Sequence, residues 1–128
     1  MEIQHHCEAV VVHCIDFRFQ KRLNEFLAEK FPEGYDRIAI AGGVKDLVAN
    51  GKESAIWKNL EISSNLHGPK SIVCIQHEDC GAYGGSSAFG DFAAEQQLQK
   101  SELEKAEELL KQQFSQQIET YFFTMEEL

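Results

Sequence analysis

Two cysteines and one histidine have the side chains and the spacing to bind a transition metal. Cys14 and His77 each follow an apolar run of residues, and Cys80 comes three residues after His77. Two thiolates and one imidazole favour zinc, and a set of three protein ligands leaves a fourth coordination position open, as in catalytic zinc sites. The His77–Cys80 spacing alone does not decide this, because such pairs are common by chance. In the alternative interpretation Cys14 packs as a small hydrophobic residue and His77 is a polar loop residue.

The segment after Cys14 adds an acid and a base. In Cys14-Ile15-Asp16-Phe17-Arg18 a carboxylate and a guanidinium stand two residues apart, so they can form a charge-assisted, bidentate pair. A carboxylate this close to a zinc ion could either bind the metal or accept a hydrogen bond from its bound water. Because Arg18 competes with the metal for Asp16, we expect the second outcome. Each residue also fits a simpler role, Asp16 as a helix N-cap and Arg18 as an exposed side chain.

The elements that position these residues follow from the pattern of apolar residues. Four short runs rich in β-branched or aromatic residues predict strands, and apolar residues at helical spacing predict helices between them. The predicted strands are 9–14, 37–41, 71–76 and 118–124, and the predicted helices are 17–31, 54–66 and a long helix with Leu103, Ala106, Leu110 and Phe114 on one face. This alternation implies an α/β fold with a mostly parallel central sheet of about four strands and helices on both faces. We expect residues 1–128 to form a single zinc-binding domain.

This topology explains how residues so far apart in the sequence can meet. Ligands of open parallel sheets collect at the carboxyl ends of the strands, near the point where the strand order reverses. Cys14 ends the first predicted strand and His77 directly follows the third. If these strands are neighbours, their ends lie about 5 Å apart. Cys80 can then fold back toward the same point, and the three side chains converge.

Composition and charge narrow the classes of function. The chain has 128 residues and a formal net charge of −9, which repels nucleic acids and anionic membranes, and no Lys/Arg cluster offsets it. The acidic stretch from Glu102 to Glu108 is interpreted as a solvated helix face. No apolar run approaches the roughly 18 residues of a membrane-spanning helix, and the first residues lack the basic and apolar regions of a signal peptide. We therefore expect a cytoplasmic protein that binds neither nucleic acid nor membrane.

The other cysteines and histidines are predicted to have no chemical role. Four cysteines without a secretion signal are not expected to form a disulfide framework. Cys7 and Cys74 are interpreted as structural, with Cys74 buried in the third strand. His5, His6 and His67 are expected to be solvated at the terminus or at a helix end.

Taken together, these motifs resemble the β-class carbonic anhydrases. That family has Cys-x-Asp-x-Arg at a strand end and, after a later apolar strand, His-x-x-Cys-Gly. The matching residues here are Cys14, Asp16 and Arg18, then His77, Cys80 and Gly81. Ala41-Gly42-Gly43 is similar to the Ala-Gly turn that follows the second strand of the family, and the whole resemblance runs from about residue 10 to residue 83.

The resemblance implies a zinc enzyme. Zinc would be bound by Cys14, His77 and Cys80, and a zinc-bound hydroxide would hydrate carbon dioxide to bicarbonate. Relatives of these enzymes hydrolyse carbonyl sulfide or carbon disulfide, so a related small substrate is an alternative.

The resemblance also assigns roles around the open metal position. Asp16 and Arg18 would form the catalytic dyad, and the backbone N–H of Gly81 would help to hold the bound anion. Members of the family assemble as dimers or larger homo-oligomers with the active site close to the subunit boundary, so we expect a homodimer or a higher homo-oligomer.

Two further function classes come from the same residues. A non-catalytic zinc-binding or regulatory domain is the alternative, because only about eight residues precede the first strand and the Arg-Asn that usually precedes the Ala-Gly turn is absent. A phosphatase-like loop is suggested by His13-Cys14 and Arg18, but its arginine would stand six residues after the cysteine, and here it stands four. Such a loop is too short to wrap a phosphate.

Overall fold

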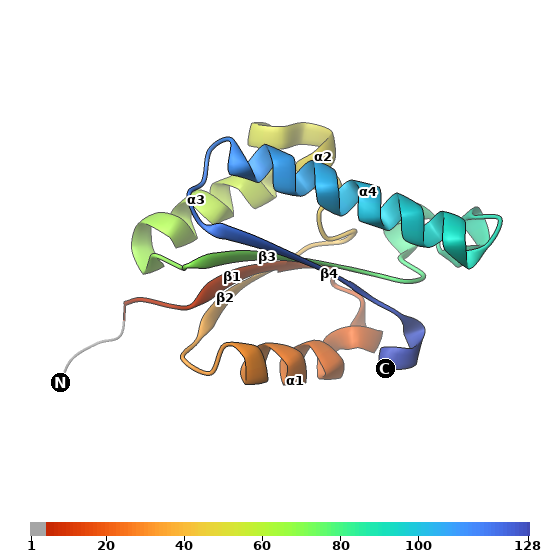
Figure 1. Cartoon of the computed structure of the whole chain (residues 1–128), viewed down its shortest axis with the longest axis horizontal. Helices are drawn as coiled ribbons and strands as arrows, with labels where there is room; N and C mark the ends of the chain where they lie inside the picture. Colours follow the sequence, from red (N-terminus) through yellow and green to blue (C-terminus); the bar gives the residue numbers. More distant parts are fainter. Residues whose placement is uncertain (1–4) are drawn as a thin grey trace.

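Four parallel strands form the central sheet in the order β2-β1-β3-β4 (Figure 1). The structure is a computed structural model that describes residues 5–128, with the backbone alone at residue 127. The strands are β1 (Ala9–His13), β2 (Tyr35–Ala39), β3 (Ser71–His77) and β4 (Gln117–Phe123). β1 pairs along its whole length with both neighbours, so that Val11 is in register with Arg37 on β2 and with Val73 on β3. β1 and β3 are buried throughout, which explains why their sequences are largely apolar.

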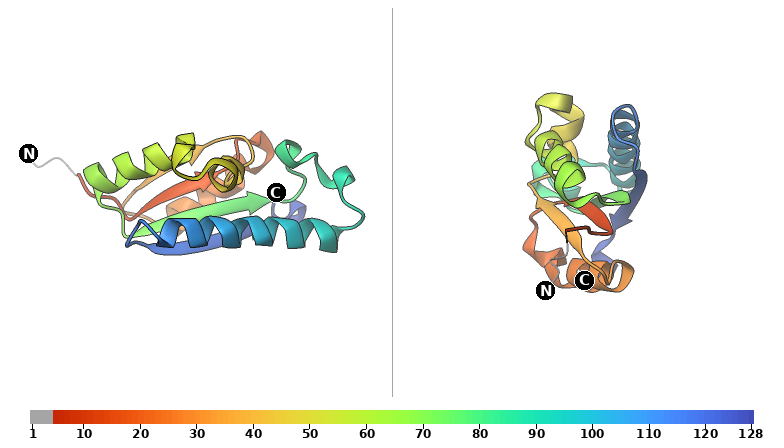
Figure 2. Two further views of the ribbon diagram at one scale, coloured as in Figure 1. Left: turned by 90° about the horizontal axis from the view of Figure 1, so that it is seen from above. Right: turned by 90° about the vertical axis from the view of Figure 1, so that its left-hand side faces the viewer.

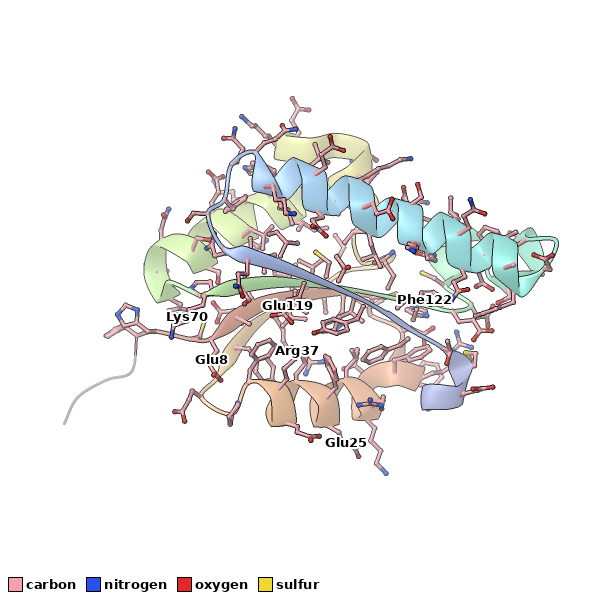
Figure 3. All side chains as sticks on the ribbon, in the orientation of Figure 1. Glu8, Glu25, Arg37, Lys70, Glu119 and Phe122 are labelled. Atoms are coloured by element: carbon pink, nitrogen blue, oxygen red, sulfur yellow. The ribbon has the colours of Figure 1, made fainter. Side chains whose placement is uncertain are left out.

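Helices cover both faces of this sheet. α1 (Gln20–Lys30) lies on one face, and α2 (Lys45–Asn50), α3 (Ala55–His67) and α4 (Phe92–Lys111) lie on the other (Figures 1 and 2). Side chains alternate between the faces of a strand, so Val10 and Val12 pack under α2, α3 and α4, whereas Ala9 and Val11 pack against α1. Figure 3 shows Arg37 and Glu119 on the α1 side of the sheet. None of the helices in the described part of the chain is long and apolar enough to cross a membrane.

The predicted fold class is confirmed. The sheet has four strands, all parallel, with helices on both faces, and β1 and β3 are neighbours, as the convergence of the candidate ligands requires. The strand order also reverses between β1 and β3, because the chain leaves β1 for β2 on one side and returns to β3 on the other.

Several boundaries differ from the prediction. β2 begins two residues earlier than predicted, because its first residues are polar positions of a partly exposed edge strand. α2 was not predicted, since six residues make fewer than two helical turns and show no apolar repeat. The predicted helix 17–31 is divided into a 3-10 turn, Phe17–Phe19, and α1. The turn is capped by Asp16, whose side chain accepts a hydrogen bond from the backbone N–H of Arg18 at 3.0 Å.

Candidate metal centre

Three potential metal ligands meet at the carboxyl ends of β1 and β3. The thiol sulfurs of Cys14 and Cys80 and a ring nitrogen of His77 lie within 4.8 Å of one another. Cys14 follows β1 and His77 is the last residue of β3. The chain then turns back through Asp79, which adopts a left-handed conformation with φ 59°, and this turn brings Cys80 to the cluster. All three side chains are buried, with 8%, 4% and 3% of Cys14, His77 and Cys80 exposed.

The spacing of the two sulfurs fits a shared tetrahedral ion. The Sγ atoms of Cys14 and Cys80 are 3.9 Å apart. Two thiolates bound to one zinc at about 2.3 Å with tetrahedral angles are about 3.8 Å apart. A disulfide would hold the same atoms at about 2.0 Å, and both cysteines are free thiols.

His77 presents a lone pair to the cluster. Its Nδ1 lies 2.7 Å from the carbonyl oxygen of Glu78; because a carbonyl only accepts, Nδ1 carries the proton and Nε2 is the acceptor. Among the described residues, Nε2 of His77 is one of two buried side-chain N or O atoms without a hydrogen-bond partner. Leaving a buried acceptor unpaired costs about 1–3 kcal/mol. A histidine whose second nitrogen donates to a backbone carbonyl is oriented as metal-binding histidines are, so the donor set fits zinc.

The charges inside the cluster favour a cation. In the metal-free protein the hydrogen bond with Cys80 lowers the pKa of Cys14 to about 3 against the opposing effect of burial. The same bond raises the pKa of Cys80, so the pair holds one thiolate and one thiol. Burial alone would lower the pKa of His77, but its contacts with Cys14, the Glu78 carbonyl and Asp16 together outweigh burial, and the pKa is raised. The Cys14 thiolate is thus already a deprotonated ligand, which metal binding requires.

The Asp16–Arg18 pair lies beside this cluster. Nη2 of Arg18 donates to Oδ2 of Asp16 at 2.6 Å, and Nε lies 3.1 Å and 3.2 Å from the two carboxylate oxygens. The hydrogen bonds from Arg18 lower the pKa of Asp16, so this carboxylate is ionised at neutral pH. Oδ2 of Asp16 is 3.9 Å from Nε2 of His77. Asp16 therefore faces the centre with both of its oxygens engaged by Arg18.

A second carboxylate, that of Asp79, also binds Arg18, and the sequence did not predict this contact. Nη1 of Arg18 donates to Oδ2 of Asp79 at 3.0 Å, and Nη2 donates to the Asp79 carbonyl oxygen at 2.9 Å. The other carboxylate oxygen of Asp79 accepts the backbone N–H of Ser86 at 2.7 Å. Glu95 on α4 then accepts the backbone N–H of Asp79 at 2.7 Å and the hydroxyl of Ser86 at 2.9 Å. Asp79 stands next to Cys80 in the sequence, but nothing in the sequence marks Glu95, which is 2% exposed.

A buried amide fixes the turn after β2. Oε1 of Gln76 accepts the backbone N–H of Val44 at 2.9 Å, and Nε2 donates to the carbonyl of Gly42 at 3.0 Å and to Oε1 of Gln99 at 2.9 Å. At Gly43, whose φ is +59°, an added Cβ would stand 2.1 Å from Oε1 of Gln76. Only glycine fits there, because both the conformation and the space exclude a side chain.

The prediction that the face from Glu102 to Glu108 is solvated is wrong for Glu102. This residue is buried, and its carboxylate accepts a hydrogen bond from the hydroxyl of Tyr83 at 2.9 Å. Burial and Glu102 together raise the pKa of Tyr83, so its hydroxyl remains a donor. Glu95, Gln99 and Glu102 thus form a polar stripe on α4 that faces the loop of the metal cluster and the Gln76 amide.

An open pocket of about 670 Å³ gives access to the cluster, and its lining includes Cys14, Asp16, Arg18 and Gly81. Phe17 also lines it and is 82% exposed. A larger groove of about 820 Å³ lies along α4 and β4 and contains none of these residues. Of these two pockets in the described part of the chain, the smaller one reaches the convergent ligands.

The two remaining cysteines, Cys7 and Cys74, lie in different surroundings. Cys74 is fully buried in β3, as predicted, and burial raises the pKa of its thiol to about 12. Cys7 and His67, for which the sequence predicts a structural role and a solvated helix end, lie together with Asp36 in a second group of potential ligands.

Comparison with known proteins gives one family and two relatives. The family model that matches residues 4–126 is described as "Putative carbonic anhydrase". An uncharacterized protein of Rickettsia conorii is 27% identical over 124 residues, which cover 91% of this chain and 66% of that protein. An uncharacterized protein of Rickettsia bellii is 26% identical over 124 residues, covering 91% of this chain and 74% of that protein. The chain thus spans just under two thirds of the first relative. No solved structure matches.

Proposed function

The chain belongs to this carbonic anhydrase family, and we propose that it is a β-class member that binds one zinc ion and hydrates carbon dioxide to bicarbonate. Cys14, His77 and Cys80 are the proposed ligands. The observation that carries the proposal is the convergence of their ligand atoms within 4.8 Å, beside a carboxylate held by an arginine. Proteins with three such ligands keep a fourth position for water or substrate.

The ion would lower the pKa of a bound water and so make hydroxide available, though less strongly than in a three-histidine site, because two thiolates offset its charge. The protein controls the surroundings of that water and of the ion. Burial of Cys14, His77 and Cys80 excludes bulk water from the ligand side of the centre. The carbonyl of Glu78 keeps the proton on Nδ1 of His77, and so keeps Nε2 available to the metal.

Asp16 is the proposed acceptor for the attacking nucleophile. Its pKa is lowered by Arg18, so it stays a charged acceptor over the pH range in which the enzyme would work. It accepts the O–H of the nucleophile and thereby directs a lone pair at the substrate carbon. Arg18 keeps both oxygens of Asp16 engaged, which opposes direct binding of Asp16 to the metal.

The composition of the pocket supports a small, weakly polar substrate. Phe17 and Ala82 offer apolar surface, while Gly81, Gly84 and Gly85 bring the backbone close to the opening. The backbone N–H of Gly81 is the proposed contact for the product anion. Carbonyl sulfide has the same linear shape, so it is the substrate to be tested beside carbon dioxide.

We also propose that the protein is a cytoplasmic homodimer. Phe17 and Ile15 are 82% and 57% exposed on the segment that borders the pocket, and exposed apolar groups next to a site favour a protein partner. A second copy seated there would cover the open side of the pocket. The free thiols of Cys14 and Cys80 suit a reducing compartment.

Stopped-flow measurement of carbon dioxide hydration tests the activity. The rate above buffer is expected to scale with the zinc content of the sample and to be lost in Cys80→Ser. Parallel assays with carbonyl sulfide identify a sulfur substrate. If the zinc-loaded protein converts neither substrate faster than the buffer does, the chain is a non-catalytic zinc-binding domain.

A further inference from the structure

We propose a second zinc site, formed by Cys7, Asp36 and His67 at the opposite end of the sheet. These residues come from three elements: the segment before β1, the second position of β2 and the last position of α3. A thiol sulfur, a carboxylate oxygen and a ring nitrogen of the three lie within 4.8 Å of one another. The inference does not depend on the proposed activity, because no residue is shared with the Cys14 centre.

The contacts around the group hold it together without an ion. The backbone N–H of Cys7 donates to the carbonyl of His67 at 3.0 Å, which fastens the segment before β1 to the end of α3. Nδ1 of His67 lies 2.7 Å from Oδ2 of Asp36. The Ser63 hydroxyl, one turn earlier on α3, donates to the same oxygen at 2.7 Å. Asp36 is therefore oriented by a residue outside the group, as metal-binding carboxylates commonly are.

The chemistry of the three side chains favours zinc over harder cations. A thiolate and an imidazole are ligands of zinc, and a carboxylate completes a set that calcium or magnesium would not select. His67 is the last residue of α3, and the carbonyl end of a helix carries a partial negative charge that attracts a cation. The net charge of −9 acts in the same direction at longer range.

The group is open to ions from solution. The side chains of His67 and Asp36 are 41% and 32% exposed, whereas the Cys14 centre is buried. With three ligands and this exposure, the site is expected to bind zinc more weakly than the Cys14 centre. An ion there would join the segment before β1 to β2 and α3, so its expected effect is to stabilise this end of the fold.

A titration of the full chain already carrying one equivalent of zinc tests the proposal. Zinc is added in competition with a chromophoric chelator, and Co²⁺ is used in parallel because thiolate ligation gives a charge-transfer band. Wild type is expected to take up a second equivalent, and Cys80→Ser is expected to keep this uptake while losing the first equivalent. Cys7→Ser should lower the affinity for the second equivalent of metal at least tenfold and remove the thiolate charge-transfer band assigned to this site. Asp36→Asn should lower the affinity for the second equivalent as well.

Two controls distinguish this site from zinc binding by the neighbouring histidines and from a loss of folding. The ring of His6 lies beside Gly68, the residue after His67, so the double variant His5→Gln/His6→Gln is titrated too. This double variant should still bind the second equivalent of zinc. If it does not, while Cys7→Ser does, the ion belongs to the terminal histidines and the proposal is overturned. Absence of a second equivalent in wild type would also overturn it. Melting curves without metal check that each variant folds, and zinc should raise the melting temperature of wild type by more than that of Cys7→Ser.

Discussion

The carboxylate of Glu95, 2% exposed in the first turn of α4, accepts the backbone N–H of Asp79 at 2.7 Å. This bond holds Asp79 in its left-handed conformation, φ 59°, which costs a non-glycine residue of the order of 1 kcal/mol or more. Held in this way, Asp79 meets Arg18 and Ser86. The loop that delivers Cys80 is therefore positioned from α4, which contributes no candidate ligand.

Replacing Glu95 should loosen this loop. Glu95→Gln removes a charged acceptor that pairs the Asp79 N–H and the Ser86 hydroxyl, so we expect the free energy of unfolding to fall by about 1–3 kcal/mol. Turnover should fall as well, because Arg18 loses a fixed partner, while zinc is retained. Glu104→Gln, at an exposed position of α4, is the matched control. Equal unfolding curves for the two variants would show that Glu95 does not hold the loop.

Removal of one thiolate ligand should abolish zinc binding at the Cys14 centre. Cys80→Ser is expected to lower the zinc content by about one equivalent per chain relative to wild type, since two remaining ligands bind zinc poorly. Cys74→Ala changes a buried thiol in the middle of β3 and should leave the content unchanged. Elemental analysis of both variants at matched protein concentration decides this. Equal metal content in the two would contradict the assignment of the ligands.

The dyad should affect turnover more than metal binding. Asp16→Asn keeps the shape of the side chain but removes the charged acceptor, so we expect zinc to be retained and the hydration rate to fall by about 100-fold or more. Arg18→Ala should free Asp16 to occupy the open metal position, giving a zinc-loaded protein with little activity. Both rates are compared with wild type after zinc has been quantified in each sample. Wild-type rates in both variants would make the dyad a structural pair.

A surface cluster on the α1 side should make stability depend on pH. Nζ of Lys30 lies 3.1 Å from the Glu119 carboxylate, which also accepts the hydroxyl of Tyr121 at 2.6 Å; Glu119 is labelled in Figure 3. Partial burial opposes ionisation, but these bonds outweigh it and lower the pKa of Glu119 below its ordinary 4.5. The stabilisation is therefore complete above pH 4.5 and is lost as the pH falls through the lowered value.

Chemical denaturation of wild type and Glu119→Gln across this range measures the effect. Wild type should be the more stable protein at neutral pH, and the difference should shrink steadily below pH 4.5. A constant difference down to acidic pH would mean that the ionised form of Glu119 contributes nothing. Glu25→Gln, at an exposed position of α1, is the control for a change of net charge.

Association should depend on the exposed phenylalanine beside the pocket. Phe17→Ser removes the largest apolar group of the segment, 82% exposed, and should shift the proposed dimer toward monomer at micromolar concentration. Multi-angle light scattering gives the mass directly. Leu66→Ser, at a position 63% exposed on α3, serves as the control and should leave the mass unchanged. A monomeric wild type would rule out the dimer.

The sequence predicts those parts of the site that lie at strand ends. Apolar runs mark β1 and β3, and the residues just beyond them, Cys14 and His77, can be placed without coordinates because parallel strands end at the same edge. The class of fold follows from the same alternation of strands and helices. These features depend on local or periodic sequence patterns, so they can be predicted from the sequence.

The supporting residues could not be predicted, because their roles depend on which elements pack together. Glu95 and Glu102 stand on a helix rich in charge, where acidic residues ordinarily face water, and only the position of α4 over the loop makes them interior groups. Cys7, Asp36 and His67 are separated by about 30 residues each and share no motif. Their proximity comes from the pairing of β2 with β1 and from the direction of α3.

The separation of Cys14 and Cys80 by 66 positions sets an order of events during synthesis of the chain. Cys14 leaves the ribosome first, and the strand that brings His77 and Cys80 to it follows much later. The complete ligand set exists only after β3 has paired with β1, a contact that closes a long segment of chain and forms slowly. Metal capture by the Cys14 centre is therefore expected to finish folding and not to start it.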